Sequence, residues 1–177
     1  MQESGVIALA CAGEQPVSCI RQAERVVGHV GDWQILSEQP ALHLLELVFR
    51  PSQISYSGAR LAELPSNAGR ITQKGRQTVT DTGCLFYGPY VPVPPGTYRL
   101  QVYGTSGSIS DARIDVAYQR GTTVLADHPL PSKATGVLLP EATVTVPEGV
   151  HDLEIRLCVS NGDVLEAHGY SFRRIEP

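Results

Sequence analysis

The sequence lacks the patterns that usually mark catalysis, metal binding or a membrane segment. Its five histidines form no His-x-His or His-Glu-x-x-His spacing, so metal catalysis finds no support. No Gly-x-Ser-x-Gly motif is present, which removes the usual mark of a serine hydrolase. No apolar run approaches the roughly 20 residues that a membrane helix needs. We therefore expect no enzyme activity, no catalytic or metal-binding residues and no membrane partner.

Excess positive charge is also absent, since the net charge is −4 and the pI is about 5.7. A nucleic-acid partner is therefore not expected, because such proteins carry a basic patch. The first residues contain a short apolar stretch but no basic residues before it, so they make a poor signal peptide. On this basis we expect a cytoplasmic protein.

Cysteine is scarce, with four residues at Cys11, Cys19, Cys84 and Cys158. No two of them form a Cys-x2–4-Cys pair, which excludes the usual zinc patterns. Four cysteines would suffice for two disulfides in an exported protein. In a cytoplasmic protein disulfides rarely persist, so the expected location predicts free thiols at Cys84 and Cys158.

Glycine and proline are plentiful, with 17 and 13 residues among 177, a frequency typical of short strands joined by turns. From Leu42 onward, apolar residues alternate with polar ones in several segments, as strands with one buried face require. In Asp152–Val159, for example, the odd-numbered residues from Leu153 are apolar. Some eight such segments predict an all-β fold, a two-sheet antiparallel jelly-roll β-sandwich.

The sandwich domain is predicted to span 41–177, and 1–40 is predicted to be an N-terminal extension or linker. Within that extension, Val17, Ile20, Val27 and Val30 lie close to helical spacing, which favours a short helix. The segment 26–30 would also serve as a strand. A helix there would suit a docking element or a connection to a larger parent protein.

The segment Gly83–Tyr103 is predicted to be a strand, a turn and a second strand. Leu85 and Tyr87 share one face of the first strand, and Tyr98, Leu100 and Val102 share one face of the second. Pro94-Pro95-Gly96 supplies the reversal, since proline presets φ and glycine accepts positive φ. We therefore expect a hairpin with one face in the core.

Several motifs carry a resemblance to a known group of domains. They are 59–66 followed by Gly69, Tyr-Gly-Pro-Tyr at 87–90, 95–99, 114–116, 153–156 and 162–165. Over roughly 42–175 the chain resembles the galactose-binding-like, carbohydrate-binding jelly-roll domain attached to bacterial glycosyltransferases and related polysaccharide-synthesis proteins. The resemblance implies an accessory binding domain and not the transferase itself, because no nucleotide-sugar site or Asp-x-Asp motif is present.

The candidate sugar-binding residues combine planar polar groups with aromatic rings. Strand alternation places polar side chains opposite the apolar set on three segments, and a single sheet would gather them into one row. Guanidinium and carboxylate groups suit sugar hydroxyls, and a ring supplies apolar contact. The predicted ligand-binding residues are Tyr87, Tyr90, Arg99, Asp115, Glu154 and Arg156. The alternative is a solvated sheet face with cross-strand ion pairs.

Several aromatic and acidic residues, including two of these candidates, also have structural explanations. One of Tyr87 and Tyr90 would serve equally as a core ring, and the other as a hydroxyl that fixes the turn. Trp33 is expected to anchor the N-terminal segment. No cofactor is expected, although Asp81, Asp111 and Asp163 could contribute to a structural calcium site in the loops.

Two functions remain after these exclusions. The first is a non-catalytic carbohydrate-binding module associated with glycan synthesis or modification, with a glycan or sugar as its ligand. The second is a structural or interaction module that docks a parent-protein domain or forms a homo-oligomer.

Overall fold

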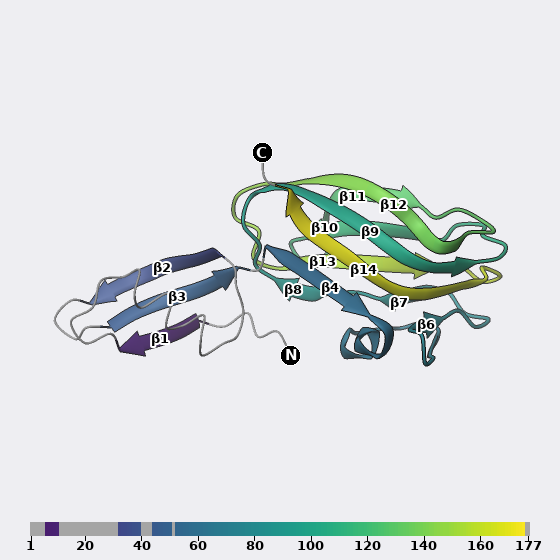
Figure 1. Ribbon diagram of the computed structural model, residues 1–177, viewed down its shortest axis with the longest axis horizontal. Helices are drawn as coiled ribbons and strands as arrows, with labels where there is room; N and C mark the ends of the chain where they lie inside the picture. The colour runs from purple at the N-terminus through teal and green to yellow at the C-terminus, as the bar shows by residue number, and fades with distance from the viewer. Residues whose placement is uncertain (1–5, 11–31, 40–43, 51, 176–177) are drawn as a thin grey trace. The chain divides into compact units, whose positions relative to one another are not determined.

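The computed structural model describes residues 6–10, 32–39, 44–50 and 52–175, and Figure 1 shows its strands. The chain divides into two compact units, Met1–Ser52 and Gln53–Pro177. The described residues contain one short 3-10 helix, η2 (Gly58–Glu63). Within these ranges, no helix is long and apolar enough to span a membrane.

The first unit contains a three-stranded antiparallel sheet in the order β1-β3-β2. Its strands are β1 (Val6–Ala10), β2 (Asp32–Gln39) and β3 (Leu44–Arg50). We predicted that the sandwich begins at residue 41, but β3 pairs with β1 and β2 and so lies in the first unit. The boundary falls at Ser52 because β3 finds its hydrogen-bond partners on both sides in that sheet. The helix predicted within 16–30 lies outside the described residues.

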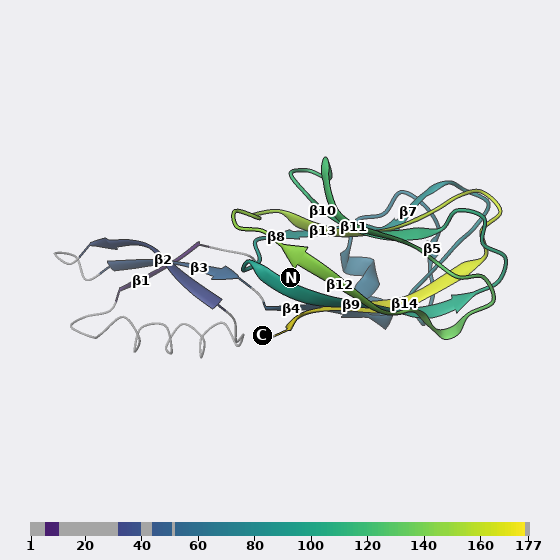
Figure 2. The ribbon, with the colours of Figure 1, turned by 90° about the horizontal axis from the view of Figure 1, so that it is seen from above.

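The second unit is a sandwich of two antiparallel sheets, whose facing layers are seen in Figure 2. The β13 sheet has the order β11-β10-β13-β7, and β8 also pairs with β13. Its strands are β7 (Gly83–Phe86), β8 (Pro89–Val91), β10 (Arg113–Tyr118), β11 (Thr123–Pro129) and β13 (Leu153–Val159).

The β9 sheet has the order β12-β9-β14-β6-β5, and β4 also pairs with β14. Its strands are β4 (Gln53–Ser57), β5 (Arg70–Ile71), β6 (Arg76–Gln77), β9 (Gly96–Ser106), β12 (Thr135–Val146) and β14 (Leu165–Ile175). The predicted all-β, two-sheet antiparallel jelly-roll class is confirmed.

The core lies between the two sheets, where the alternating apolar residues of each strand meet. Tyr98, Leu100 and Val102 are fully buried, as predicted, and so are Ile155 and Leu157 from the facing sheet. Burying a side chain of this size stabilises the fold by about 1.5–3 kcal/mol. Strand period and core position therefore agree along β9 and for the apolar residues of β13.

The predicted hairpin in Gly83–Tyr103 is wrong. Strands β7 and β8 pair with β13, whereas β9 pairs with β12 and β14 in the other sheet. Both edges of β9 are thus occupied, and no edge is left for β8. The Pro94–Gly96 segment carries the chain from one sheet to the other, and the Tyr98 hydroxyl donates a hydrogen bond to the Pro94 carbonyl at 2.9 Å.

Cys84 and Cys158 form a disulfide between β7 and β13, so the predicted free thiols are wrong for this pair. The two residues face each other directly in the register of these strands. That register joins positions 74 residues apart, and spacing alone does not reveal it. Cys11 and Cys19 lie outside the described residues.

We predict that the Cys84–Cys158 bond stabilises the sandwich measurably. A disulfide that closes a long loop contributes about 2–4 kcal/mol, largely by restricting the unfolded chain. Denaturant unfolding with and without reductant should differ by about that amount, and peptide mapping without reductant should recover the two cysteines as one linked pair.

The matched control is the double variant C84S/C158S, whose stability should not respond to reductant. Equal unfolding free energies of the native chain under both conditions would contradict the prediction.

Candidate functional site

An ion pair ties β10 to β13 on the outward face of the β13 sheet. Asp115 lies opposite Arg156 in the strand register. The guanidinium donates two hydrogen bonds to the carboxylate, Nε to Oδ1 at 2.7 Å and Nη2 to Oδ2 at 2.9 Å. The third nitrogen, Nη1, donates to the Gly121 carbonyl at 3.3 Å. The hydrogen bond to Asp115 raises the pKa of Arg156 and fixes its orientation.

Glu154 precedes Arg156 by two residues and so faces the same side of β13. Only 4% of Glu154 is exposed. Burial raises the pKa of its carboxyl, and the neighbouring Arg156 partly offsets that effect. The Tyr90 hydroxyl lies beside the same carboxylate, where its interaction with Glu154 works to lower the pKa of that carboxyl. The face thus holds a desolvated carboxylate with a tyrosine as its direct partner.

Tyr87 and Tyr90 form a pair of rings beside this carboxylate. Their centroids lie 6.4 Å apart and their planes are inclined by 74°. Tyr90 is 41% exposed, and burial, followed by the charge of Glu154, raises its pKa. Its φ of 61° is rare for a residue other than glycine. The two rings thus lie close together beside Glu154, and a role at the edge of a binding site stays a prediction.

The turn between β10 and β11 borders the same carboxylate and was missed in the sequence. Gln119 and Arg120 both have φ of 55°, and the Asp152 carboxylate accepts their backbone N–H groups at 2.9 and 2.7 Å. A Cβ on Gly121 would lie 2.4 Å from Nη1 of Arg156 and 2.8 Å from Oε1 of Glu154. Only glycine fits there without displacing these groups.

Backbone conformations of this kind gather around Glu154. Among the described residues other than glycine, four have left-handed φ, and three of them are Tyr90, Gln119 and Arg120. Such conformations cost about 1–3 kcal/mol each and often occur at functional sites. The only sequence signal for the turn was a short polar stretch ending in Gly121.

Arg99 does not join this group, so the predicted row of Arg99, Asp115, Glu154 and Arg156 on one sheet is wrong. Its strand, β9, belongs to the opposite sheet, where Arg99 Nε lies 3.0 Å from Glu141 Oε1. Alternation correctly placed Arg99 on an outward face, but it does not reveal which sheet a strand joins. The structure brings together Tyr87, Tyr90, Asp115, Glu154 and Arg156, and their role in binding stays a prediction.

Other aromatic residues of the chain divide between the core and the surface. Phe86 and Tyr170 are buried and stack at 5.3 Å between the sheets. Tyr103 is partly exposed on β9, and its hydroxyl donates to Gln101 at 3.2 Å. Trp33 lies on β2 opposite Phe49 in the first unit.

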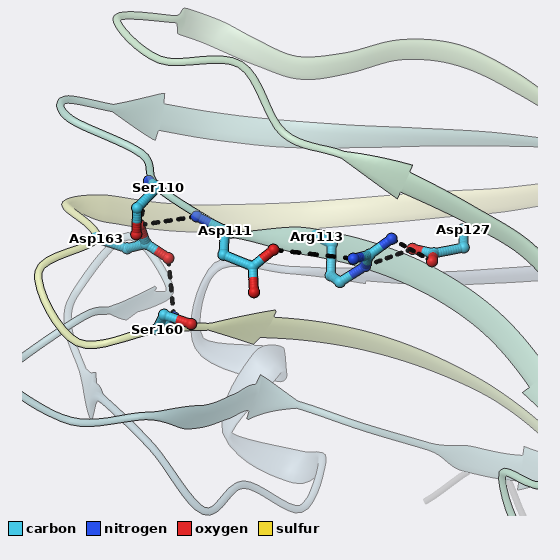
Figure 3. Close-up of polar contacts among 6 residues, drawn as sticks. All are labelled: Ser110, Asp111, Arg113, Asp127, Ser160 and Asp163. Atoms are coloured by element: carbon cyan, nitrogen blue, oxygen red, sulfur yellow. Dashed lines mark hydrogen bonds and ion pairs between the residues drawn. The ribbon is translucent and has the colours of Figure 1, made fainter.

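The loop carboxylates proposed for calcium have protein partners, as Figure 3 shows for two of them. Asp163 accepts hydrogen bonds from the Ser110 backbone and hydroxyl at 2.6 and 2.9 Å and from the Ser160 backbone at 2.8 Å. Oδ1 of Asp111 lies 3.8 Å from Nη1 of Arg113. Within the described part of the chain, no three His, Cys, Asp or Glu side chains gather so as to hold a metal ion.

No protein-family model and no curated protein matches this sequence. Two solved structures are similar to it. The first is the C-terminal CBM6 of LamC, a marine laminarinase from Zobellia galactanivorans, with a TM-score of 0.47 and 12% identity over 69% of this chain and 99% of that one. The second is a carbohydrate-binding module, CBM6cm-2, of Cellvibrio mixtus lichenase 5A in complex with cellotriose, with a TM-score of 0.45 and 10% identity over 70% and 98%.

We predict that the substitution D163N destabilises the sandwich by about 1–3 kcal/mol, because N–H donors would face an amide nitrogen. Burial works to raise the pKa of Asp163, but the hydrogen bonds from Ser110 and Ser160 outweigh it and lower the pKa. The stabilisation is therefore complete above the unfolded pKa and lost as pH falls through the folded one. Denaturant unfolding should show the two proteins converging below about pH 4.

The control is D127N, at the exposed partner of Arg113, which should cost no more than about 1 kcal/mol. A difference between native and D163N proteins that persists unchanged at acid pH would contradict the assignment.

Proposed function

We propose that the sandwich is a non-catalytic carbohydrate-binding module whose site is the face around Glu154. The observation that carries the proposal is the exposed ring of Tyr90 beside the nearly buried Glu154 carboxylate, where β8 pairs with β13. A sugar presents C–H faces that pack on aromatic rings and hydroxyls that donate to carboxylates. Tyr87 supplies a second ring at a steep angle to the first.

The proposal accounts for features that the core does not require. Tyr90 keeps much of its ring in water although its backbone adopts an unfavourable φ. Glu154 is buried although its pKa is raised, so its ionised form costs stability at neutral pH. Both costs are understandable if these groups are held ready for a ligand.

We further propose that the module is accessory to a protein of glycan synthesis or modification. The support is the resemblance of the Tyr-Gly-Pro-Tyr motif at 87–90 and the flanking segments to domains of that kind. A cytoplasmic location is kept as part of the proposal. The Cys84–Cys158 bond speaks against it, because disulfides rarely persist in a reducing compartment. Peptide mapping of protein taken directly from its native compartment would decide the question.

The alternative, an interaction module, is favoured by one observation on the opposite sheet. Tyr103 and Val137 lie opposite each other on β9 and β12, and both are exposed. A homo-oligomer or a docked parent-protein domain could cover them. Sedimentation of the native chain and of the variants Y103S and V137S would test this, since both substitutions should then yield monomers.

We predict that Y90A and E154Q each weaken glycan binding by about tenfold or more, since truncated central contacts commonly cost at least 1–2 kcal/mol. A glycan array with the intact chain should first identify a ligand, and calorimetry should then measure its affinity for each variant. R99A is the matched control, because Arg99 lies on the other sheet and its loss should leave binding unchanged.

Stability distinguishes a binding role from a structural one. Because burial raises the pKa of Glu154, folding disfavours its ionised form, and E154Q should be at least as stable as the native protein at neutral pH. Binding that survives both Y90A and E154Q would place the site elsewhere, and loss of binding accompanied by unfolding of E154Q would make Glu154 a structural group.

A further inference from the structure

The groups around Glu154 offer a ligand acceptors in preference to donors. Each guanidinium nitrogen of Arg156 already donates to Asp115 or to the Gly121 carbonyl. The Tyr90 hydroxyl is engaged with Glu154. The N–H groups of Gln119 and Arg120 are held by Asp152. Apart from the exposed side chain of Arg120, a ligand that must accept hydrogen bonds therefore meets donors that are already paired.

This face also carries more negative than positive charge. Asp115, Asp152 and Glu154 carry three carboxylates, and Arg156 and the exposed Arg120 carry two guanidinium groups. Arg156 is neutralised by its two bonds to Asp115. Farther along β10, Arg113 and Asp127 cancel each other. The face thus holds one carboxylate more than it holds guanidinium groups, and the nearly buried Glu154 feels the charge of Arg156 but forms no ion pair of its own among the described residues.

The two tyrosine rings complete an environment suited to a cation. Tyr87 and Tyr90 present their planes at 74° to each other with centroids 6.4 Å apart, and Tyr90 adjoins the Glu154 carboxylate. An ammonium group is attracted to the face of an aromatic ring and more strongly to a carboxylate that water reaches poorly. Rings and carboxylate at one place favour a positively charged group over a neutral hydroxyl.

We propose that this site recognises a sugar carrying a free, protonated amine, such as a glucosamine unit of a deacetylated glycan. The inference deepens the proposed carbohydrate-binding function and rests on it. The ammonium group donates to Glu154 and lies against the Tyr90 ring, while the sugar ring packs on Tyr87. N-acetylation of the sugar removes the positive charge and leaves only a neutral amide. A uronic acid brings a further carboxylate, which Glu154 and Asp152 repel.

The experiment compares glycans of equal length by calorimetry with the intact chain at neutral and at slightly acidic pH, because the amine must be protonated while Glu154, whose pKa burial raises, must be ionised. The probes are a glucosamine oligomer, its N-acetylated counterpart, a neutral glucose oligomer and a galacturonic acid oligomer. The glucosamine oligomer should bind at least tenfold more tightly than the N-acetylated one, and the galacturonic acid oligomer should show no binding. E154Q should abolish the difference between the first two.

The control variant is E148Q, which removes an equal charge from the exposed turn after β12. Because the whole chain is acidic, a polycation could bind without a defined site, and such binding would weaken equally in E148Q and E154Q. That result would overturn the proposal. A native preference that E148Q keeps and E154Q loses supports it.

The outcome also separates this inference from the proposed function. If a neutral or N-acetylated oligomer binds as tightly as the glucosamine oligomer, and Y90A weakens both, the amine preference is refuted while the carbohydrate site stands. If no member of the panel or of the glycan array binds, both are refuted.

Discussion

The bidentate pair of Asp115 and Arg156 is the interaction on which the rest of the face depends. It joins β10 to β13 across the strand register and binds the guanidinium that neighbours Glu154, whose charge still partly offsets the rise in the pKa of Glu154. Burying two charges is costly unless geometry and hydrogen bonding are good, and here three nitrogens of Arg156 have partners. The consequence is a carboxylate, Glu154, that is nearly buried, has a raised pKa and forms no ion pair of its own among the described residues.

Backbone constraints set the limits of the same face. Left-handed φ, which residues other than glycine rarely adopt, occurs at Tyr90 on one side and at Gln119 and Arg120 on the other. The carboxylate of Asp152 holds Gln119 and Arg120 in place. Gly121 admits the close approach of Glu154 and Arg156 that a side chain would block. The sheet supplies the rigid support, and the two flanking segments supply the shape.

Strand alternation predicted which side chains point inward, and the buried rows on β9 and β13 agree with it. It could not predict sheet membership, since a period of two is the same in either sheet, and so Arg99 was grouped with residues on the opposite side. Long-range strand register decides three further features that alternation does not reveal. They are the contact of Cys84 with Cys158, the transfer of the chain between sheets at Pro94–Gly96 and the pairing of β3 with β1. The role of Asp152 likewise depends on a turn in which Gln119 and Arg120, neither of them glycine, adopt left-handed φ.

The most direct test of the central claim, that the face around Glu154 is where a glycan binds, is an amide chemical-shift map of the isotopically labelled intact chain during glycan titration. The account predicts that the largest changes fall on 87–91, 119–121 and 153–156, and that they saturate together with one affinity. Changes concentrated on β9 and β12 of the opposite sheet, with 87–91 and 153–156 unmoved, would contradict it.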